Sequence, residues 1–200
     1  MAGEWNVLAK ARNDMADLLD GLSDEQLNSP SLCEEWTVAD VAGHAVSVVE
    51  MSMPSLIAGS IKNRKDIDGY FAATAKDFSK MGAPALASSL RTNAGKKLMF
   101  FSEASMVNDT AVHLQDMRRP LGLSDSLDPE VLQVALDEAA REFAKKLDDE
   151  TTPRLVATDT GWSWGAGPEV RGTAEALLMA LNRRDVASEL EGDGISLLPS

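Results

Sequence analysis

Apolar residues recur every three or four positions through most of the chain, which places them on one face of an α-helix. The stretches that show this period are residues 4–22, 38–53, 68–81, 84–101, 108–120, 129–147 and 173–184. Alanine and leucine dominate the apolar set, while aromatic residues make up 5%, and this composition favours helices over strands. The pattern therefore predicts a mainly helical protein.

Capping residues mark the starts of two predicted helices. Thr37 and Asp40 have the spacing of a capping box. Asp128 is the expected N-cap of a later helix, with Pro129 in its first turn. The stripe expected to face inward after Thr37 comprises Val38, Val41, Ala45, Val48 and Val49. His44 falls on this stripe. Pro54 is expected to kink or end the helix, and a later helix is expected to begin at Asn108 or Asp109.

The pattern changes after residue 150. Residues 154–158 resemble a strand, and residues 162–164 and 169–171 are predicted to pair as a hairpin across a Gly-Ala-Gly-Pro turn. Trp162 and Trp164 would face one side of it, where they pack on the bundle or wall a pocket. Thr173 is the expected cap of the last helix. We predict a helical bundle over residues 1–150 and a small α/β region over residues 151–200.

The charge and the single cysteine limit the function classes. A net charge of −13 and a pI near 4.5 argue against nucleic acid and anionic membranes as partners, because both require clustered Lys and Arg. Cys33 alone provides no disulfide framework, and neither a signal-peptide pattern nor a membrane-length apolar run is visible. We expect a cytoplasmic protein that is a monomer or a homodimer.

The chain contains only two histidines, and both are candidate metal ligands. Asp109 and His113 are four residues apart, so they share one face of a helix. With His44 they would supply two imidazoles and one carboxylate, a set that suits zinc and leaves one coordination position open. The alternative is two ordinary core histidines, with Asp109 as a helix cap and Asp116 paired with Arg118 or Arg119.

Three stretches resemble one known family. Residues 33–44 read Cys-x-x-Trp-Thr-Val-x-Asp-Val-x-x-His, and residues 113–122 read His-x-x-Asp-x-Arg-Arg-Pro-Leu-Gly. Residues 156–181 match the tail of the same family. In this order, and over nearly the whole chain, the motifs are similar to those of the DinB-like, mycothiol-dependent maleylpyruvate isomerase family.

The resemblance implies a fold and a chemistry. The fold is mainly α, a DinB-like four-helix bundle with a small α/β C-terminal region. Family members hold a divalent metal, typically zinc, at the positions of His44, Asp109 and His113. They use mycothiol, the low-molecular-weight thiol of actinobacteria, for isomerisation or S-transfer. The family usually has Glu at the position of Asp109, so here the helix must lie closer to the metal or a water must bridge.

The first functional hypothesis is a metal-dependent enzyme that activates mycothiol toward a small electrophilic substrate. A non-catalytic metal-binding or regulatory module is the alternative, and a thiol-independent hydrolase or lyase is a third possibility. Arg91 is the candidate catalytic residue, because a guanidinium binds both oxygens of a substrate carboxylate. Arg171 and Arg183 are candidate thiol-binding residues, and each arginine has the alternative role of a surface charge. Cys33 is predicted to pack as a small apolar residue.

Overall fold

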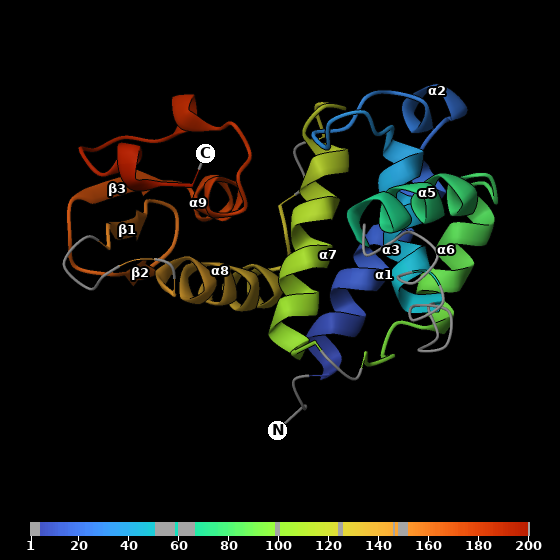
Figure 1. Cartoon of the computed structure of the whole chain (residues 1–200), viewed down its shortest axis with the longest axis horizontal. Helices are drawn as coiled ribbons and strands as arrows, with labels where there is room; N and C mark the ends of the chain where they lie inside the picture. The colour runs from blue at the N-terminus through green and yellow to red at the C-terminus, as the bar shows by residue number, and fades with distance from the viewer. Residues whose placement is uncertain are drawn as a thin grey trace. The chain divides into compact units, whose positions relative to one another are not determined.

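The computed structural model describes residues 5–50, 59, 67–98, 101–123, 126–145, 147 and 152–199. Its elements, shown in Figure 1, are α1 (Trp5–Gly21), α2 (Asp24–Leu27), α3 (Val38–Glu50), α5 (Ile67–Ser79), α6 (Ala83–Thr92), α7 (Glu103–Arg118), α8 (Pro129–Ala144), β1 (Arg154–Ala157), β2 (Ser163–Trp164), β3 (Glu169–Gly172), α9 (Ala174–Leu181) and the short 3₁₀ helices η1 (Ala187–Glu189) and η2 (Ile195–Leu197). The predicted fold class, mainly helical with a small C-terminal sheet, is confirmed.

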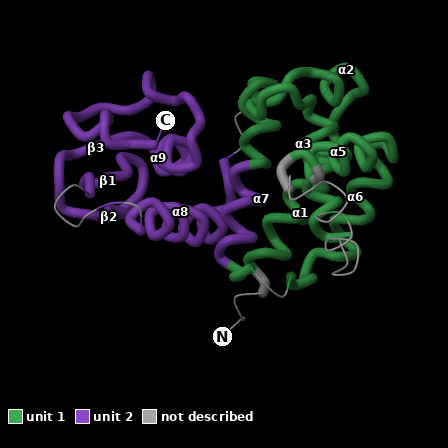
Figure 2. Tube along the Cα trace, viewed as in Figure 1, with its two compact units in different colours: residues 1–103, 113–125 green, residues 104–112, 126–200 purple. Residues whose placement is uncertain are grey.

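The chain divides into two compact units (Figure 2). Unit 1 comprises residues 1–103 and 113–125, and unit 2 comprises residues 104–112 and 126–200. The division passes through α7, which is itself one continuous helix. The boundary predicted near residue 150 separates regions that would fold independently. The division into compact units does not test this property, so the boundary stays a prediction. Among the described residues, no helix has both the length and the apolar character that crossing a membrane requires.

The core of unit 1 follows the predicted helical period. Helix α3 packs against α5 and α6, and α1 packs against α6. The buried residues of α1, α3 and α6 include Leu8, Met15, Leu19, Val38, Val41, Val46, Val49, Leu86 and Leu90. Burying each such side chain contributes about 1.5–3 kcal/mol. Val48 is half-buried instead of facing the core, and Val46 takes the inward position.

Helices α3 and α5 approach closely at Gly43. A Cβ atom at this position would overlap the carbonyl oxygen of Ala75 and lie 2.7 Å from the backbone nitrogen of Ser79. The contact therefore requires a residue without a side chain. Because His44 follows directly, the same close packing fixes where α3 presents this imidazole.

A buried arginine connects α1 to the segment after α6. Arg12 is 2% exposed, and its Nη1 donates to the carbonyl oxygens of Asn93, Ala94 and Lys96 at 3.1, 3.0 and 2.8 Å. Carbonyl groups beyond the end of a helix need such donors when they are buried. These bonds help to end α6 at Thr92, whereas the hydrophobic period predicted a helix to residue 101.

Unit 2 contains a three-stranded sheet in the order β2-β1-β3. Strand β1 pairs antiparallel with β2 and parallel with β3, with Leu155 opposite Trp164 on one side and Val170 on the other. Helix α9 packs against α8 and against the sheet. The predicted pairing of residues 162–164 with residues 169–171 is wrong, because β1 lies between these strands. The Gly-rich segment, residues 165–168, connects β2 to β3 across β1. Local turn signals do not distinguish such a connection from a hairpin turn.

Local capping was predicted correctly, but some helix bounds were not. The Thr37–Asp40 capping box, the Asp128 cap and the Thr173 cap are all present. Helix α7 begins at Glu103, not at Asn108 or Asp109, and α8 ends three residues before Leu147. Asn108 Oδ1, the atom that could have capped a helix, accepts a hydrogen bond from Asn182 Nδ2 at 3.2 Å, so a tertiary contact uses it instead. Pro54 lies outside the described residues.

The Trp162 indole packs toward α8. Its Nε1 donates to Asp137 Oδ1 at 2.7 Å, and Trp164 is half-buried on β2. The two alternatives for this pair, packing on the bundle and walling a pocket, both stay predictions.

We predict that Gly43→Ala lowers the free energy of unfolding by about 1–3 kcal/mol, because the added methyl overlaps the backbone of α5. Urea denaturation followed by circular dichroism measures this change. Gly21→Ala is the matched control, since a Cβ at Gly21 meets nothing within 4 Å. Its stability should be unchanged or slightly raised. Equal stability of the two variants would contradict the close packing of α3 on α5.

Candidate metal centre

The first imidazole comes from α3. The capping box at Thr37 starts this helix, and the buried valines orient it so that half-buried His44 lies among other rings. The centroid of its ring lies 5.4 Å from that of Trp36 and 5.9 Å from that of Phe71 on α5. These aromatic neighbours restrict the rotation of the ring.

The second imidazole and the carboxylate come from α7. Asp109 and His113 are four residues apart on this continuous helix, so the helix itself sets their spacing, independently of how the two units are arranged. Asp109 is exposed and His113 is half-buried. Because α7 begins six positions earlier, at Glu103, the alternative role of Asp109 as a helix cap is excluded.

The three predicted ligands come together. One potential ligand atom from each of His44, Asp109 and His113 lies within 4.8 Å of the other two. The ring centroids of His44 and His113 are 5.0 Å apart at an interplanar angle of 74°. Two imidazoles on one tetrahedral zinc place their centroids about 5 Å apart, since each metal–nitrogen bond is about 2 Å long. Two nitrogens and one carboxylate oxygen in this arrangement fit a divalent cation.

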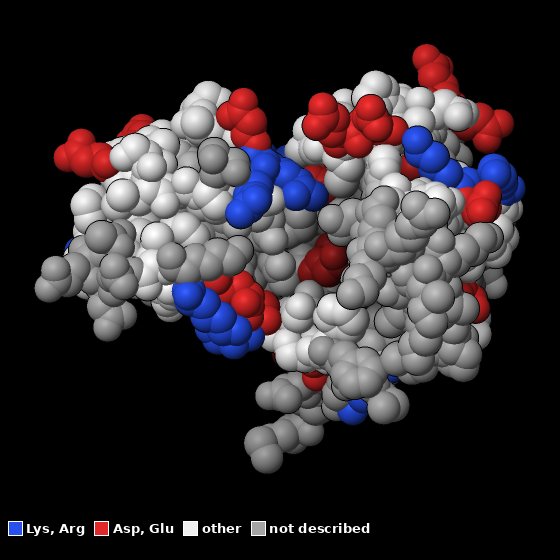
Figure 3. Space-filling view, viewed as in Figure 1, with Lys and Arg blue, Asp and Glu red and all other residues white. Residues whose placement is uncertain are grey.

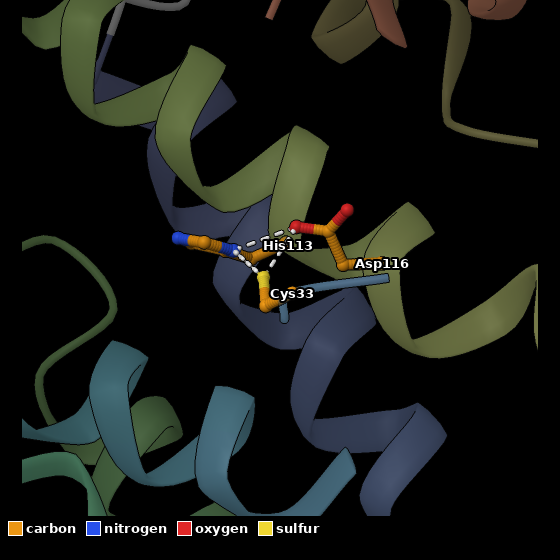
Figure 4. A group of neighbouring side chains, drawn as sticks. All are labelled: Cys33, His113 and Asp116. Atoms are coloured by element: carbon orange, nitrogen blue, oxygen red, sulfur yellow. Dashed lines mark hydrogen bonds and ion pairs between the residues drawn. The ribbon is translucent and has the colours of Figure 1, made fainter. Parts of the chain in front are cut away.

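A second group of side chains shares His113 (Figure 4). Asp116 Oδ2 lies 2.9 Å from His113 Nδ1 and accepts a hydrogen bond from Cys33 Sγ at 3.1 Å. Cys33 Sγ also lies 3.7 Å from His113 Nδ1. The Asp116 side chain is completely buried, whereas the His113 side chain is 14% exposed. Figure 4 shows the other ring nitrogen of His113 pointing away from Cys33 and Asp116.

This second group corrects one interpretation of the sequence and adds a contact to another. Cys33 was predicted to pack as an apolar residue, but it is half-buried and its thiol donates to a carboxylate. Asp116, for which Arg118 or Arg119 was the suggested partner, contacts His113; the arginine pairing stays a prediction. The signal was present in the sequence, since His-x-x-Asp places both side chains on one helical face. The thiol contact had no such signal, because Cys33 is far from α7 along the chain.

Two of the three predicted arginines, Arg91 and Arg171, contact nearby carboxylates. Arg91 forms ion pairs with Asp17 and Asp20, and hydrogen bonds to these carboxylates, Asp17 first, raise the pKa of its guanidinium. Arg171 is exposed on β3, and its Nη1 donates to Glu169 at 3.1 Å. Their functional roles stay predictions.

Arg183 lies at a cavity in unit 2. It is exposed, has a left-handed backbone with φ of 64°, and lines a cavity of about 450 Å³ with Arg184 and Val186. Its predicted role in thiol binding likewise stays a prediction.

Acidic side chains gather on the surface of unit 1 over α2 and the loop that follows it (Figure 3). The exposed carboxylates there belong to Asp24, Glu25, Glu34 and Glu35. Glu34 and Glu35 directly follow Cys33 in sequence. A negative surface of this kind raises the local concentration of cations.

The fold and the site define the class of this protein. It is a mainly helical protein with a small sheet and a candidate His-Asp-His metal centre on two helices. The sequence model of the mycothiol maleylpyruvate isomerase N-terminal domain matches residues 8–182. The chain therefore belongs to this family, and the resemblance found in the sequence is confirmed.

Solved structures agree on the fold. The mycothiol-dependent maleylpyruvate isomerase superposes with a TM-score of 0.59 at 12% identity, covering 95% of this chain and 91% of that one. A histidine-to-alanine mutant of the mycothiol-dependent maleylpyruvate isomerase gives 0.57 with the same identity and coverage. At this identity the likeness shows the fold alone. No curated protein matches the chain.

We predict that the purified protein binds one equivalent of Zn²⁺ and that EDTA lowers its melting temperature. A ligand at 100 times its Kd stabilises a fold by about 2.7 kcal/mol. His44→Ala and His113→Ala should each lose the bound metal, as measured by elemental analysis. Asp109→Glu should retain or strengthen binding. Asp77→Asn is the control, because it removes an exposed carboxylate of α5 that pairs with Lys80, the residue after this helix. Stoichiometric metal in His113→Ala would rule out the assignment.

Proposed function

We propose that this protein is a divalent-metal-dependent enzyme that activates mycothiol for isomerisation or S-transfer on a small electrophilic substrate. The observation that carries the proposal is the convergence of His44, Asp109 and His113 within 4.8 Å, in a chain that belongs to the mycothiol maleylpyruvate isomerase family. Zinc is the proposed ion, because two imidazoles and one carboxylate are ligands that zinc takes at its reactive sites.

The donor set supports this chemistry. A divalent cation with an open coordination position lowers the pKa of a thiol, so that the nucleophilic thiolate is available at neutral pH. His44 and His113 contribute neutral nitrogens, and Asp109 contributes one negative charge. Three ligands leave room for a further one, and the exposure of Asp109 leaves this side of the donor group open to small molecules.

Two outcomes follow from an activated thiolate. With a cis-enone acid, the sulfur adds to the double bond, the resulting single bond rotates, and elimination of the thiolate restores the double bond as the trans isomer. With an electrophile that carries a leaving group, the sulfur displaces that group and the conjugate is the product. Both proposals use the same three ligands, so the substrate decides between them.

A carboxylate on the substrate requires a cationic partner. We propose Arg91 for this role and Arg171 and Arg183 for contacts to the thiol. Arg91 would have to exchange its ion pairs with Asp17 and Asp20 for the substrate.

One observation favours a second candidate function. Asp109 is one methylene shorter than the Glu that the family usually has at this position, and it is exposed. A weaker or water-bridged ligand is compatible with a non-catalytic metal-binding or regulatory module. This alternative requires metal binding without turnover.

We predict that the zinc-loaded protein, with mycothiol, converts maleylpyruvate to its trans isomer or forms a conjugate with a haloarene. His113→Ala should reduce the rate to the uncatalysed level, and Asp77→Asn should leave it unchanged. Absorbance and mass spectrometry measure the two products. Omission of mycothiol should abolish turnover, whereas activity without any thiol would favour a hydrolase or lyase. A fully loaded protein that gives neither product would favour the non-catalytic module.

A further inference from the structure

We infer that Asp116 is a positioning residue that commits the His113 imidazole to bind a cation through Nε2, and that Cys33 holds Asp116 in place for this task. The inference rests on the proposed metal site and deepens it. It concerns two residues for which the sequence suggested other roles.

The hydrogen bond to Asp116 determines which nitrogen of His113 carries the proton. A neutral imidazole has one N–H and one lone pair, so a carboxylate that accepts from Nδ1 leaves the lone pair on Nε2. Asp116 Oδ2 lies 2.9 Å from Nδ1, and the other ring nitrogen points away from this contact in Figure 4. A carboxylate behind a metal-binding imidazole both orients the ring and increases its basicity.

The burial of Asp116 makes this contact obligatory. Its side chain is fully buried, and a buried carboxylate is stable only when donors surround it. The thiol of Cys33 provides a second donor to the same oxygen, Oδ2, at 3.1 Å. The two donors approach from different segments, one from α7 and one from the loop before α3.

Asp116 also couples the two helices that carry the imidazoles. Its backbone oxygen accepts from the nitrogen of Leu32 at 3.0 Å, in addition to the thiol contact of its side chain. The loop held in this way continues to Thr37, which caps α3, and His44 follows two turns later. One residue on α7 therefore anchors both its own histidine and the start of the helix that presents the other.

The same three side chains allow a different interpretation. Cys33 Sγ, His113 Nδ1 and Asp116 Oδ2 could all be ligands of a second cation. The observed distances of 2.9 and 3.1 Å are ordinary hydrogen bonds among the three groups, which explains the cluster without an ion. We therefore assign it to positioning, and the experiment below separates the two.

The test uses Asp116→Asn, which keeps an oxygen acceptor, and Asp116→Leu, which has similar size and no acceptor. Zinc affinity measured by chelator competition should fall 10- to 100-fold in Asp116→Leu and less in Asp116→Asn. Cys33→Ser should bind zinc like the wild type, and Cys33→Ala a few-fold more weakly. Thr110→Val is the control, since it removes a buried hydrogen bond within α7, from the Thr110 hydroxyl to the Met106 carbonyl oxygen, without touching the ring.

A spectroscopic readout separates positioning from general stability. With only two histidines in the chain, ¹⁵N NMR of the metal-free protein reports the tautomer of each ring, and the His44→Ala variant assigns the signals. Under conditions where the imidazoles are neutral, His113 should carry its proton on Nδ1 in the wild type, Asp116→Asn and Thr110→Val. Asp116→Leu should lose this preference. Circular dichroism establishes that each variant is folded.

The outcomes are distinct. Unchanged zinc affinity and an unchanged His113 tautomer in folded Asp116→Leu overturn the inference, while the metal site itself stands. Two equivalents of zinc in the wild type, one of them lost in Cys33→Ala, also overturn it and establish the second cation. If the wild type binds no metal, the proposed function fails, but the tautomer measurement still decides whether Asp116 controls the ring.

Discussion

The His113 imidazole is held at Nδ1 by a buried carboxylate, and its ring lies close to the other potential ligands. Asp116 Oδ2 lies 2.9 Å from Nδ1, and the His44 ring centroid lies 5.0 Å from that of His113. An imidazole that makes contacts through both ring nitrogens cannot rotate easily, because a rotation that improves the contact of one nitrogen breaks that of the other. The geometry of the candidate site depends on this restriction, since α7 supplies two of its three donors.

The helix that carries His44 is restricted in a comparable way. The capping box at Thr37 starts α3, the loop before it is bound to Asp116, and Gly43 allows the backbone of α5 to approach. These contacts act on the backbone rather than on the imidazole. Ligands placed by rigid helices are more precise than ligands on loops, and precision matters where a bond length of about 2 Å must be met.

Several features could be predicted from the sequence because their causes are local. Thr37, Asp128 and Thr173 cap helices through bonds to residues two or three positions away, so the spacing contains the whole interaction. Asp109 and His113 were predicted to share a face for the same reason. Their convergence with His44 required more than spacing, and the family motifs supplied that information.

Other features depend on partners that are distant in the chain. The Cys33 thiol contacts Asp116, Asn108 contacts Asn182, and β1 lies between β2 and β3. None of these has a periodic signal, because hydrophobic periodicity identifies the buried face of an element but not its neighbour. The sequence by itself determined the helical character, the caps and the set of possible ligands, since each follows from local bonding and chemical type. Only the tertiary structure decided which nitrogen of His113 remains for a cation, because a buried carboxylate takes its partners from whatever the fold places within about 3 Å.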